Sequence, residues 1–164
     1  MLITREIARK IGANEALKFV SVGLGVAYLI MALLAGPLFF IAMSDFDLNF
    51  ICAIIVIYLC GYVYGQRAGL SILIKRRNYA LIGFLYSFLT LITATFLASW
   101  VGFFQQIHNH PGESDNSFND YIYKPVFLVM LFGLIPVIGV GIWFGRSILK
   151  KGIKISEAMP LETT

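Results

Sequence analysis

The stretch PVFLVMLFGLIPVIGVGIWF, residues 125–144, holds twenty consecutive positions without a charged side chain. A helix that crosses the ~30 Å hydrocarbon core of a bilayer needs ~20 mostly apolar residues, because each residue rises ~1.5 Å. Three more stretches with uncharged cores lie at 17–43, 49–64 and 79–107. The pattern predicts a polytopic membrane protein with four spanning helices.

The composition agrees with this prediction. Of the 164 residues, 59% are hydrophobic and 13% are charged, whereas a soluble domain has about a quarter of its residues charged. We place the spans at about 17–43, 49–66, 79–107 and 125–149. These spans leave no room for a separate soluble domain, so residues 1–164 are expected to form a single integral membrane domain.

The basic residues are distributed unevenly about these spans. Twelve of the thirteen lysines and arginines lie on one side of the spans: before or at the start of the first, between the second and third, and at the end of or after the fourth; Lys124 is the exception. By the positive-inside rule, both termini are cytoplasmic, which agrees with an even number of spans. The predicted fold is therefore an all-α, antiparallel four-helix transmembrane bundle. The low charge inside the spans fits a bacterial inner (cytoplasmic) membrane.

The residues before the first span have a pattern of their own. Ile3, Ile7 and Ile11 recur at every fourth position, and Arg5 and Arg9 fall elsewhere around the helix. This spacing predicts a short N-terminal amphipathic helix that lies in the cytoplasmic interface. Pro136 lies in the middle of the fourth span and is expected to kink it.

Small residues recur at helical spacing in the second and third spans. They are Gly61, Gly65 and Gly69 in one, and Gly83, Ser87, Thr90, Ala94, Ala98 and Gly102 in the other. Small faces let membrane helices approach closely, because association in lipid depends on packing and hydrogen bonds. Such faces pack the bundle internally or meet another subunit or a second copy. For an outward-facing stripe, the glycines of the second span are the best candidate.

Hydroxyl groups on the third span leave a second interpretation open. Ser87 and Thr90, together with Ala94, share a face that could line a narrow pore in a homo-oligomer. The alternative is that these hydroxyls bond to the carbonyls of their own helix.

The loop between the third and fourth spans contains a weak metal-binding pattern. His108 and His110 are followed by Glu113 and Asp115, and imidazole and carboxylate groups are suitable ligands for zinc or copper. The loop is also rich in Pro, Gly, Ser and Asn, which is typical of an exposed turn without metal.

Enzymatic functions are disfavoured by what the spans lack. The interiors of the four predicted spans contain no Asp, Glu, Lys, Arg or His for a proton relay or a protease, and no catalytic residue or cofactor is predicted. The leading hypothesis is a non-catalytic accessory or assembly subunit of a larger membrane complex, with the lipid bilayer and other membrane subunits or its own copies as partners and no nucleic acid. The alternatives are a homo-oligomeric channel or membrane-permeabilising effector, and a small membrane enzyme or metal-handling protein that uses the histidine loop.

Overall fold

The computed structural model describes residues 3–35, 47–109 and 118–158. In these ranges the chain is helical throughout apart from short ends and one turn, and it has no strand, which confirms the all-α prediction there. The elements are α1 (Arg5–Ala35), α3 (Asp47–Gly69), η1 (Leu70–Ile74), α4 (Tyr79–Asn109), η2 (Asn119–Tyr123) and α5 (Lys124–Ala158), where η denotes a single π-helical turn.

Three helical segments of the described chain are long and apolar enough to cross a membrane. They are Ile51–Ile74, Tyr79–Gln105 and Asn119–Glu157, which include most of the second, third and fourth predicted spans. The first predicted span, 17–43, runs along α1 and continues into residues outside the described ranges.

The N-terminal segment differs from the prediction. The expected interfacial helix is not a separate element, because α1 runs without a break from Arg5 to Ala35. The Thr4 hydroxyl accepts a hydrogen bond from the backbone N–H of Ile7 (3.4 Å), which caps the start of α1. Ala8 and Ile11 are buried against the rest of the chain. Protein packing therefore occupies the face that was expected to lie on lipid.

A tight turn of four residues, Lys75–Asn78, connects η1 to α4. The Lys75 backbone N–H donates to the Leu70 carbonyl (3.1 Å), which closes the π-helical turn. Arg76 has a φ of 49°, in the left-handed region that reverses the chain direction. The Asn78 side chain then accepts from the N–H of Ala80 (2.9 Å) and caps α4.

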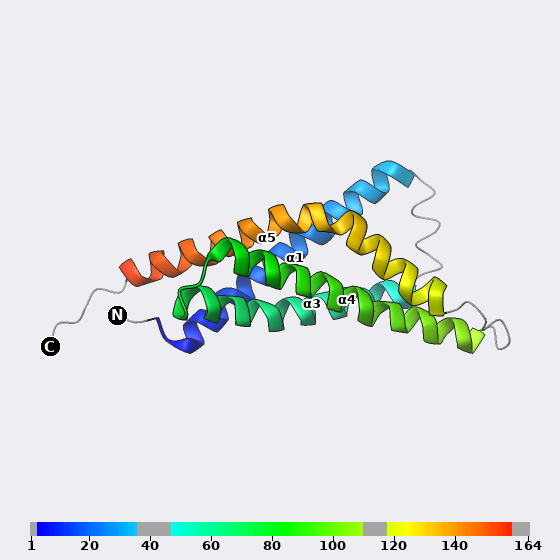
Figure 1. Ribbon diagram of the computed structural model, residues 1–164, viewed down its shortest axis with the longest axis horizontal. Helices are drawn as coiled ribbons and strands as arrows, with labels where there is room; N and C mark the ends of the chain where they lie inside the picture. Colours follow the sequence, from blue (N-terminus) through cyan, green and yellow to red (C-terminus); the bar gives the residue numbers. More distant parts are fainter. Residues whose placement is uncertain (1–2, 36–46, 110–117, 159–164) are drawn as a thin grey trace.

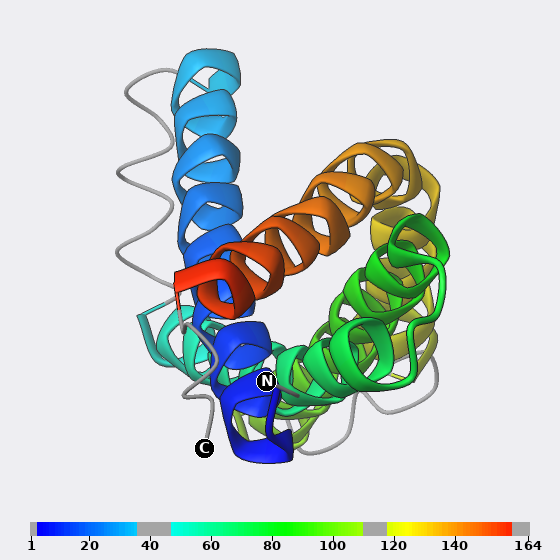
Figure 2. The same cartoon turned by 90° about the vertical axis from the view of Figure 1, so that its left-hand side faces the viewer.

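The best-packed part of the molecule lies at the end that carries this turn. The first turns of α1, the Lys75–Asn78 turn and the last turns of α5 all meet there (Figures 1 and 2). The core at this end comprises Ile11, Ala16, Ala68, Ile72, Ile82, Phe144 and Ile148. All three segments that carry the clustered basic residues thus lie near one end, which we call the basic end.

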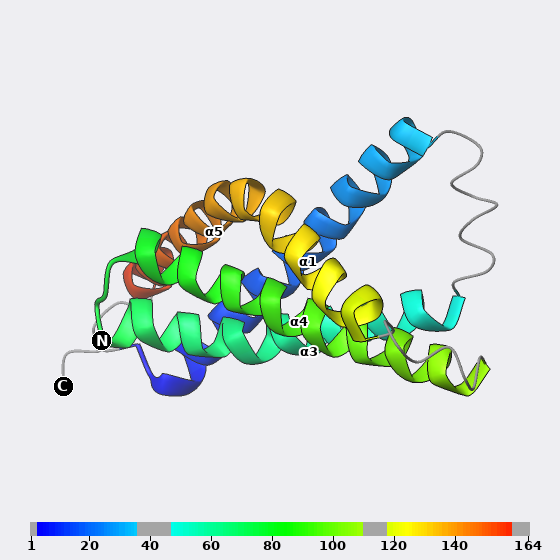
Figure 3. The same ribbon diagram turned by 45° about the vertical axis from the view of Figure 1, so that its right-hand side comes forward.

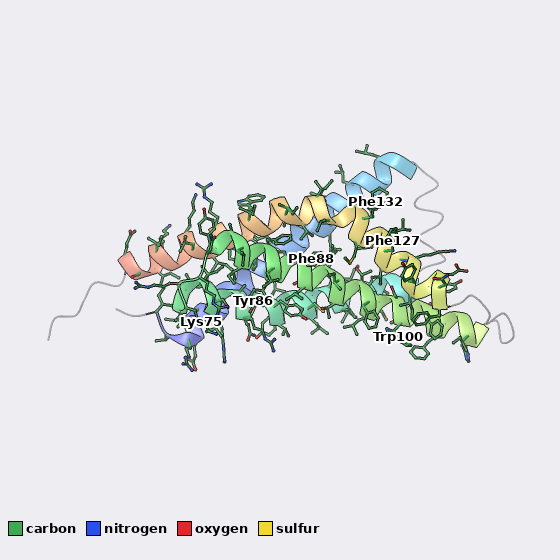
Figure 4. All side chains as sticks on the ribbon, in the orientation of Figure 1. Lys75, Tyr86, Phe88, Trp100, Phe127 and Phe132 are labelled. Atoms are coloured by element: carbon green, nitrogen blue, oxygen red, sulfur yellow. The ribbon has the colours of Figure 1, made fainter. Side chains whose placement is uncertain are left out.

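Toward the opposite end, α1 separates from the other helices (Figure 3). α1 diverges from α4 and α5 along its second half, and α5 bends in its middle, where Pro136 lies (Figure 3). Trp100 lies near this far end of α4, while Lys75 lies at the basic end (Figure 4). The Trp100 ring packs against Phe103 and Phe104, with ring centroids 5.6 and 5.5 Å away.

Candidate functional site

The glycines of α3 pack against α1 of the same chain. A Cβ atom placed on Gly65 would lie 2.7 Å from the Gly12 carbonyl oxygen and 2.5 Å from the Ala16 Cβ. A Cβ atom on Gly69 would lie 3.0 Å from the Gly12 Cα, and one on Gly61 would lie 2.9 Å from a methyl group of Val20. The two backbones are therefore in direct contact. This stripe is used inside the chain and is not the outward-facing surface that the sequence left open.

A second close crossing joins α4 to α5. A Cβ atom on Gly83 would lie 2.8 Å from the Gly145 nitrogen, and one on Gly141 would lie 2.7 Å from the Phe84 Cα. The sequence placed Gly83 in a small-residue face, and the structure gives that face a glycine partner surface on α5. Both crossings lie in the half of the molecule nearer the basic end.

The remaining small residues of α4 have looser surroundings. Ala94 is buried and Ser87 and Ala98 are half-buried. A Cβ atom on Gly102 would lie 3.7 Å from the Tyr121 ring, which is ordinary contact. The Thr90 hydroxyl donates to the Tyr86 carbonyl of its own helix (2.8 Å). The Thr93 hydroxyl pairs with that of Tyr64 on α3 (3.1 Å). These two hydroxyls therefore have protein partners within the chain.

A buried carboxylate connects the first helix to the last. Glu15 on α1 is only 3% exposed, and its two carboxylate oxygens accept hydrogen bonds from the Ser147 hydroxyl and the Lys151 ammonium group on α5. Lys18 lies 3.6 Å from the same carboxylate. Next to this group, the Phe19 ring packs edge-on against Trp143 (centroids 5.1 Å apart). Glu15 and Phe19 together dock α1 onto α5.

The electrostatics of Glu15 favour its charged form. Burial by itself raises the pKa of this carboxyl group, but the hydrogen bonds from Lys151 and Ser147 and the charges of Lys151 and Lys18 outweigh it, so the net pKa is lowered. Sequence reasoning assigned Glu15 no role. The available signal was its position, because Glu15 continues the series Ile3, Ile7, Ile11 on the same helix face.

The second half of α1 is largely exposed where the structure describes its side chains. From Ser21 to Leu29 every residue is exposed except Leu24, which is half-buried. A Cβ atom on Gly23 or Gly25 would have no atom within 4 Å. The Ser21 hydroxyl forms a hydrogen bond with that of Tyr58 on α3 (2.7 Å).

The predicted metal site is only partly described. His108 lies exposed in the last turn of α4, whereas His110, Glu113 and Asp115 fall outside the described residues. Among the residues that the structure describes, no group of three histidine, cysteine or acidic side chains is placed to hold a metal ion.

Comparison with known proteins adds no constraint on the function. No protein-family model matches the chain, and no curated protein or solved structure is significantly similar to it.

Proposed function

We propose that this protein is a non-catalytic integral membrane protein that binds another membrane subunit through the second half of α1. The chain would form an antiparallel four-helix bundle with both termini on the cytoplasmic side, in a bacterial inner membrane. Its role would be that of an accessory or assembly subunit of a larger membrane complex. The three apolar helices and the location of the clustered basic residues near one end support the membrane part of this proposal.

The observation that carries the proposal is the exposure of α1 between Ser21 and Leu29. A helix that belongs to a bundle buries one face even when lipid covers the others. α5 has such a face, because Val129, Gly133 and Val137 are half-buried at every fourth position. α1 has no comparable continuous face in this segment. This exposed segment of α1 is therefore the part of the chain best placed to accept a helix from another protein.

The composition of this segment suits close helix packing. The helix surface has shallow depressions at its small residues, which alternate with the larger Val22, Val26 and Leu29. The small residues are Ser21, Gly23, Gly25 and Ala27. Association between helices in lipid depends on such local fit, since burial from water supplies no driving force there. The expected partner is a transmembrane helix with a complementary face of large apolar side chains.

The pore-forming alternative receives less support. It requires the Ser87, Thr90 and Ala94 face of α4 to line an aqueous path, but Ala94 is buried and the Thr90 hydroxyl already bonds within its own helix. The metal-handling alternative is supported by no contact among the described residues, since only His108 of its four ligands is described.

The test is native mass spectrometry of the protein extracted gently from its source membrane through a C-terminal tag. The wild-type chain is expected to carry a second, different membrane protein. Gly25→Leu should reduce the bound fraction about tenfold, because a bulky side chain would block close packing on α1. Gly139→Leu on α5 is the matched control, since that position is equally open and a Cβ atom there has no atom within 4 Å.

Each other result has a definite meaning. A strictly monomeric wild-type protein with nothing bound overturns the proposal. Partner binding that is equal in both leucine variants moves the interface away from α1. A defined homo-oligomer with no other protein bound supports the channel or effector alternative, which ion-flux measurements in liposomes with Thr90→Leu would then examine.

A further inference from the structure

A groove opens at the basic end of the molecule, between η1, the start of α4 and the last turns of α5. It has a volume of about 700 Å³, which is within the ~300–1,000 Å³ range of small-molecule sites. At Gly152 the Leu73 side chain packs directly against the α5 backbone, since a Cβ atom there would lie 2.3 Å from a Leu73 methyl group. The residues that line it are Ile3, Ile72, Leu73, Arg76, Arg77, Asn78, Tyr79, Leu149, Gly152, Ile153 and Ser156.

The polar side of this groove is positively charged. Arg76 and Arg77 line it, and no aspartate or glutamate does. In the described part of the chain, every carboxylate that forms an ion pair does so with a lysine, so no described carboxylate pairs with Arg76 or Arg77. The N-terminus of α4 begins at Tyr79 and adds partial positive charge at the same place. This side therefore suits an anion with several acceptor oxygens.

The other side of the groove is apolar. Leu73 and Leu149 are half-buried in it, and Ile72 is 2% exposed at its base. Ile153 is 50% exposed at its edge on α5. An inorganic anion would leave these side chains without a partner, whereas a molecule with both a charged group and a hydrocarbon chain would cover both sides.

We propose that this groove binds one anionic phospholipid. Arg76 and Arg77 receive the phosphate group, since the planar guanidinium matches phosphate oxygens with paired hydrogen bonds. One acyl chain lies along Leu149 and Ile153. Basic pockets at the cytoplasmic ends of membrane helices are suited to such headgroups. The site rests on the proposed membrane insertion of the chain but is independent of partner binding by α1, which is proposed for the other end of the molecule.

The experiment titrates the delipidated full-length protein, in mild detergent, with phosphatidylglycerol and with phosphatidylcholine of identical acyl chains, and counts bound lipids by native mass spectrometry. One phosphatidylglycerol is expected to bind in preference to phosphatidylcholine. The double variant R76Q/R77Q should weaken this binding about tenfold or more, because two charge-assisted hydrogen-bond donors are lost. The matched control is R9Q/R67Q, which removes two exposed arginines outside the groove.

Soluble competitors show whether the groove binds the phosphate of a lipid headgroup or a free phosphate. Glycerol 3-phosphate and inorganic phosphate, at millimolar concentration, are expected to leave the bound phosphatidylglycerol in place. If either displaces it completely, the groove is a site for a free phosphate and the lipid proposal is wrong. Equal losses in R76Q/R77Q and R9Q/R67Q would also overturn it, because general surface charge would then explain the binding.

A second measurement avoids the arginine variants altogether, should they fail to fold. A photo-reactive benzophenone side chain at Ile153 in the otherwise unchanged protein is expected to cross-link phosphatidylglycerol more than phosphatidylcholine. The same benzophenone at Leu81, an exposed position of α4 that does not line the groove, is the control. Equal cross-linking of the two lipids at Ile153 contradicts the proposal.

Discussion

The two ends of α1 differ in what they contact, and the sequence of the helix explains the difference. Along the series Ala8, Gly12, Ala16, Val20 and Leu24, each four residues from the next, the side chains grow from small to large. The small members touch the backbone of α3, and α1 diverges beyond them. Glycine-mediated crossings in membranes are inclined at about −40°. A close crossing at one end therefore requires separation at the other.

The largest effect is expected from a bulky side chain placed in the close crossing between α1 and α3. Gly65→Leu places a side chain where the Gly12 carbonyl oxygen and the Ala16 Cβ already lie. We expect the free energy of unfolding to fall by about 3 kcal/mol, at the upper end of the usual cost of overpacking. Thermal unfolding in detergent measures this. Gly139→Leu should keep or raise the stability, because the site is open and leucine favours helix more than glycine does. Equal stability of both variants would show that the crossing is not needed.

The next effect concerns the link between α1 and α5. Glu15→Gln removes the charge that Lys151 and Lys18 face, and we expect a loss of about 2 kcal/mol. This is below the full cost of breaking a buried pair, because the Lys151 side chain is 43% exposed. Glu6→Gln is the control, since Glu6 is exposed on the same helix. An unfolding temperature that falls as much for Glu6→Gln as for Glu15→Gln would argue against a role for the buried link between α1 and α5.

The same carboxylate predicts a dependence of stability on pH. The pKa of Glu15 is lowered in the folded protein from its ordinary value of 4.5. Its contribution is therefore fully present above pH 4.5 and is lost as the pH falls through the lower folded-state pKa. We expect the wild-type protein to lose up to about 2 kcal/mol over this range. Chemical unfolding at a series of pH values measures it. The profile of Glu15→Gln should be flatter, and parallel profiles would assign the acid sensitivity to other groups.

The smallest expected effect concerns a single hydrogen bond between α3 and α4. Tyr64→Phe removes the hydroxyl that pairs with Thr93 between α3 and α4. Hydrogen bonds between membrane helices contribute about 0.6 kcal/mol on average, and we expect a loss of this size in thermal unfolding. Tyr62→Phe, at a residue that is 47% exposed, should cause no measurable change. A loss above about 2 kcal/mol for Tyr64→Phe would mean that the pair supports more than one bond.

The local features of the fold could be predicted from the sequence, because they depend on short-range composition. The apolar stretches locate most of α3, α4 and α5, and Pro136 lies where α5 bends. The stripes of small residues could also be found by their spacing. Their partners could not, since the spacing of Gly61, Gly65 and Gly69 is the same whether they face α1 or another protein. Glycine spacing describes a face of a helix and does not identify what covers it.

Glu15 illustrates the second limit. Its partner Lys151 is 136 residues away in the chain, so no local pattern connects them. The continuity of α1 was missed for a related reason. The isoleucine spacing at its start correctly identified an apolar face, but that face is covered by α3 and α5 and not by lipid. Whether lipid or protein covers an apolar face is decided by the tertiary arrangement, which periodicity does not encode.

The connection between Glu15 and Lys151 also has a consequence for synthesis of the chain. At about 5–20 residues per second, the ribosome adds Lys151 on the order of ten seconds after Glu15, given their separation of 136 residues. During that interval the carboxylate has only Lys18 beside it, and α1 can cross α3 but cannot dock on α5. The helix that is made first, α1, is thus among the last to reach its final contacts. A chain that stops before Ser147 would keep the crossing of α1 with α3 but would leave the Glu15 carboxylate without its partners on α5.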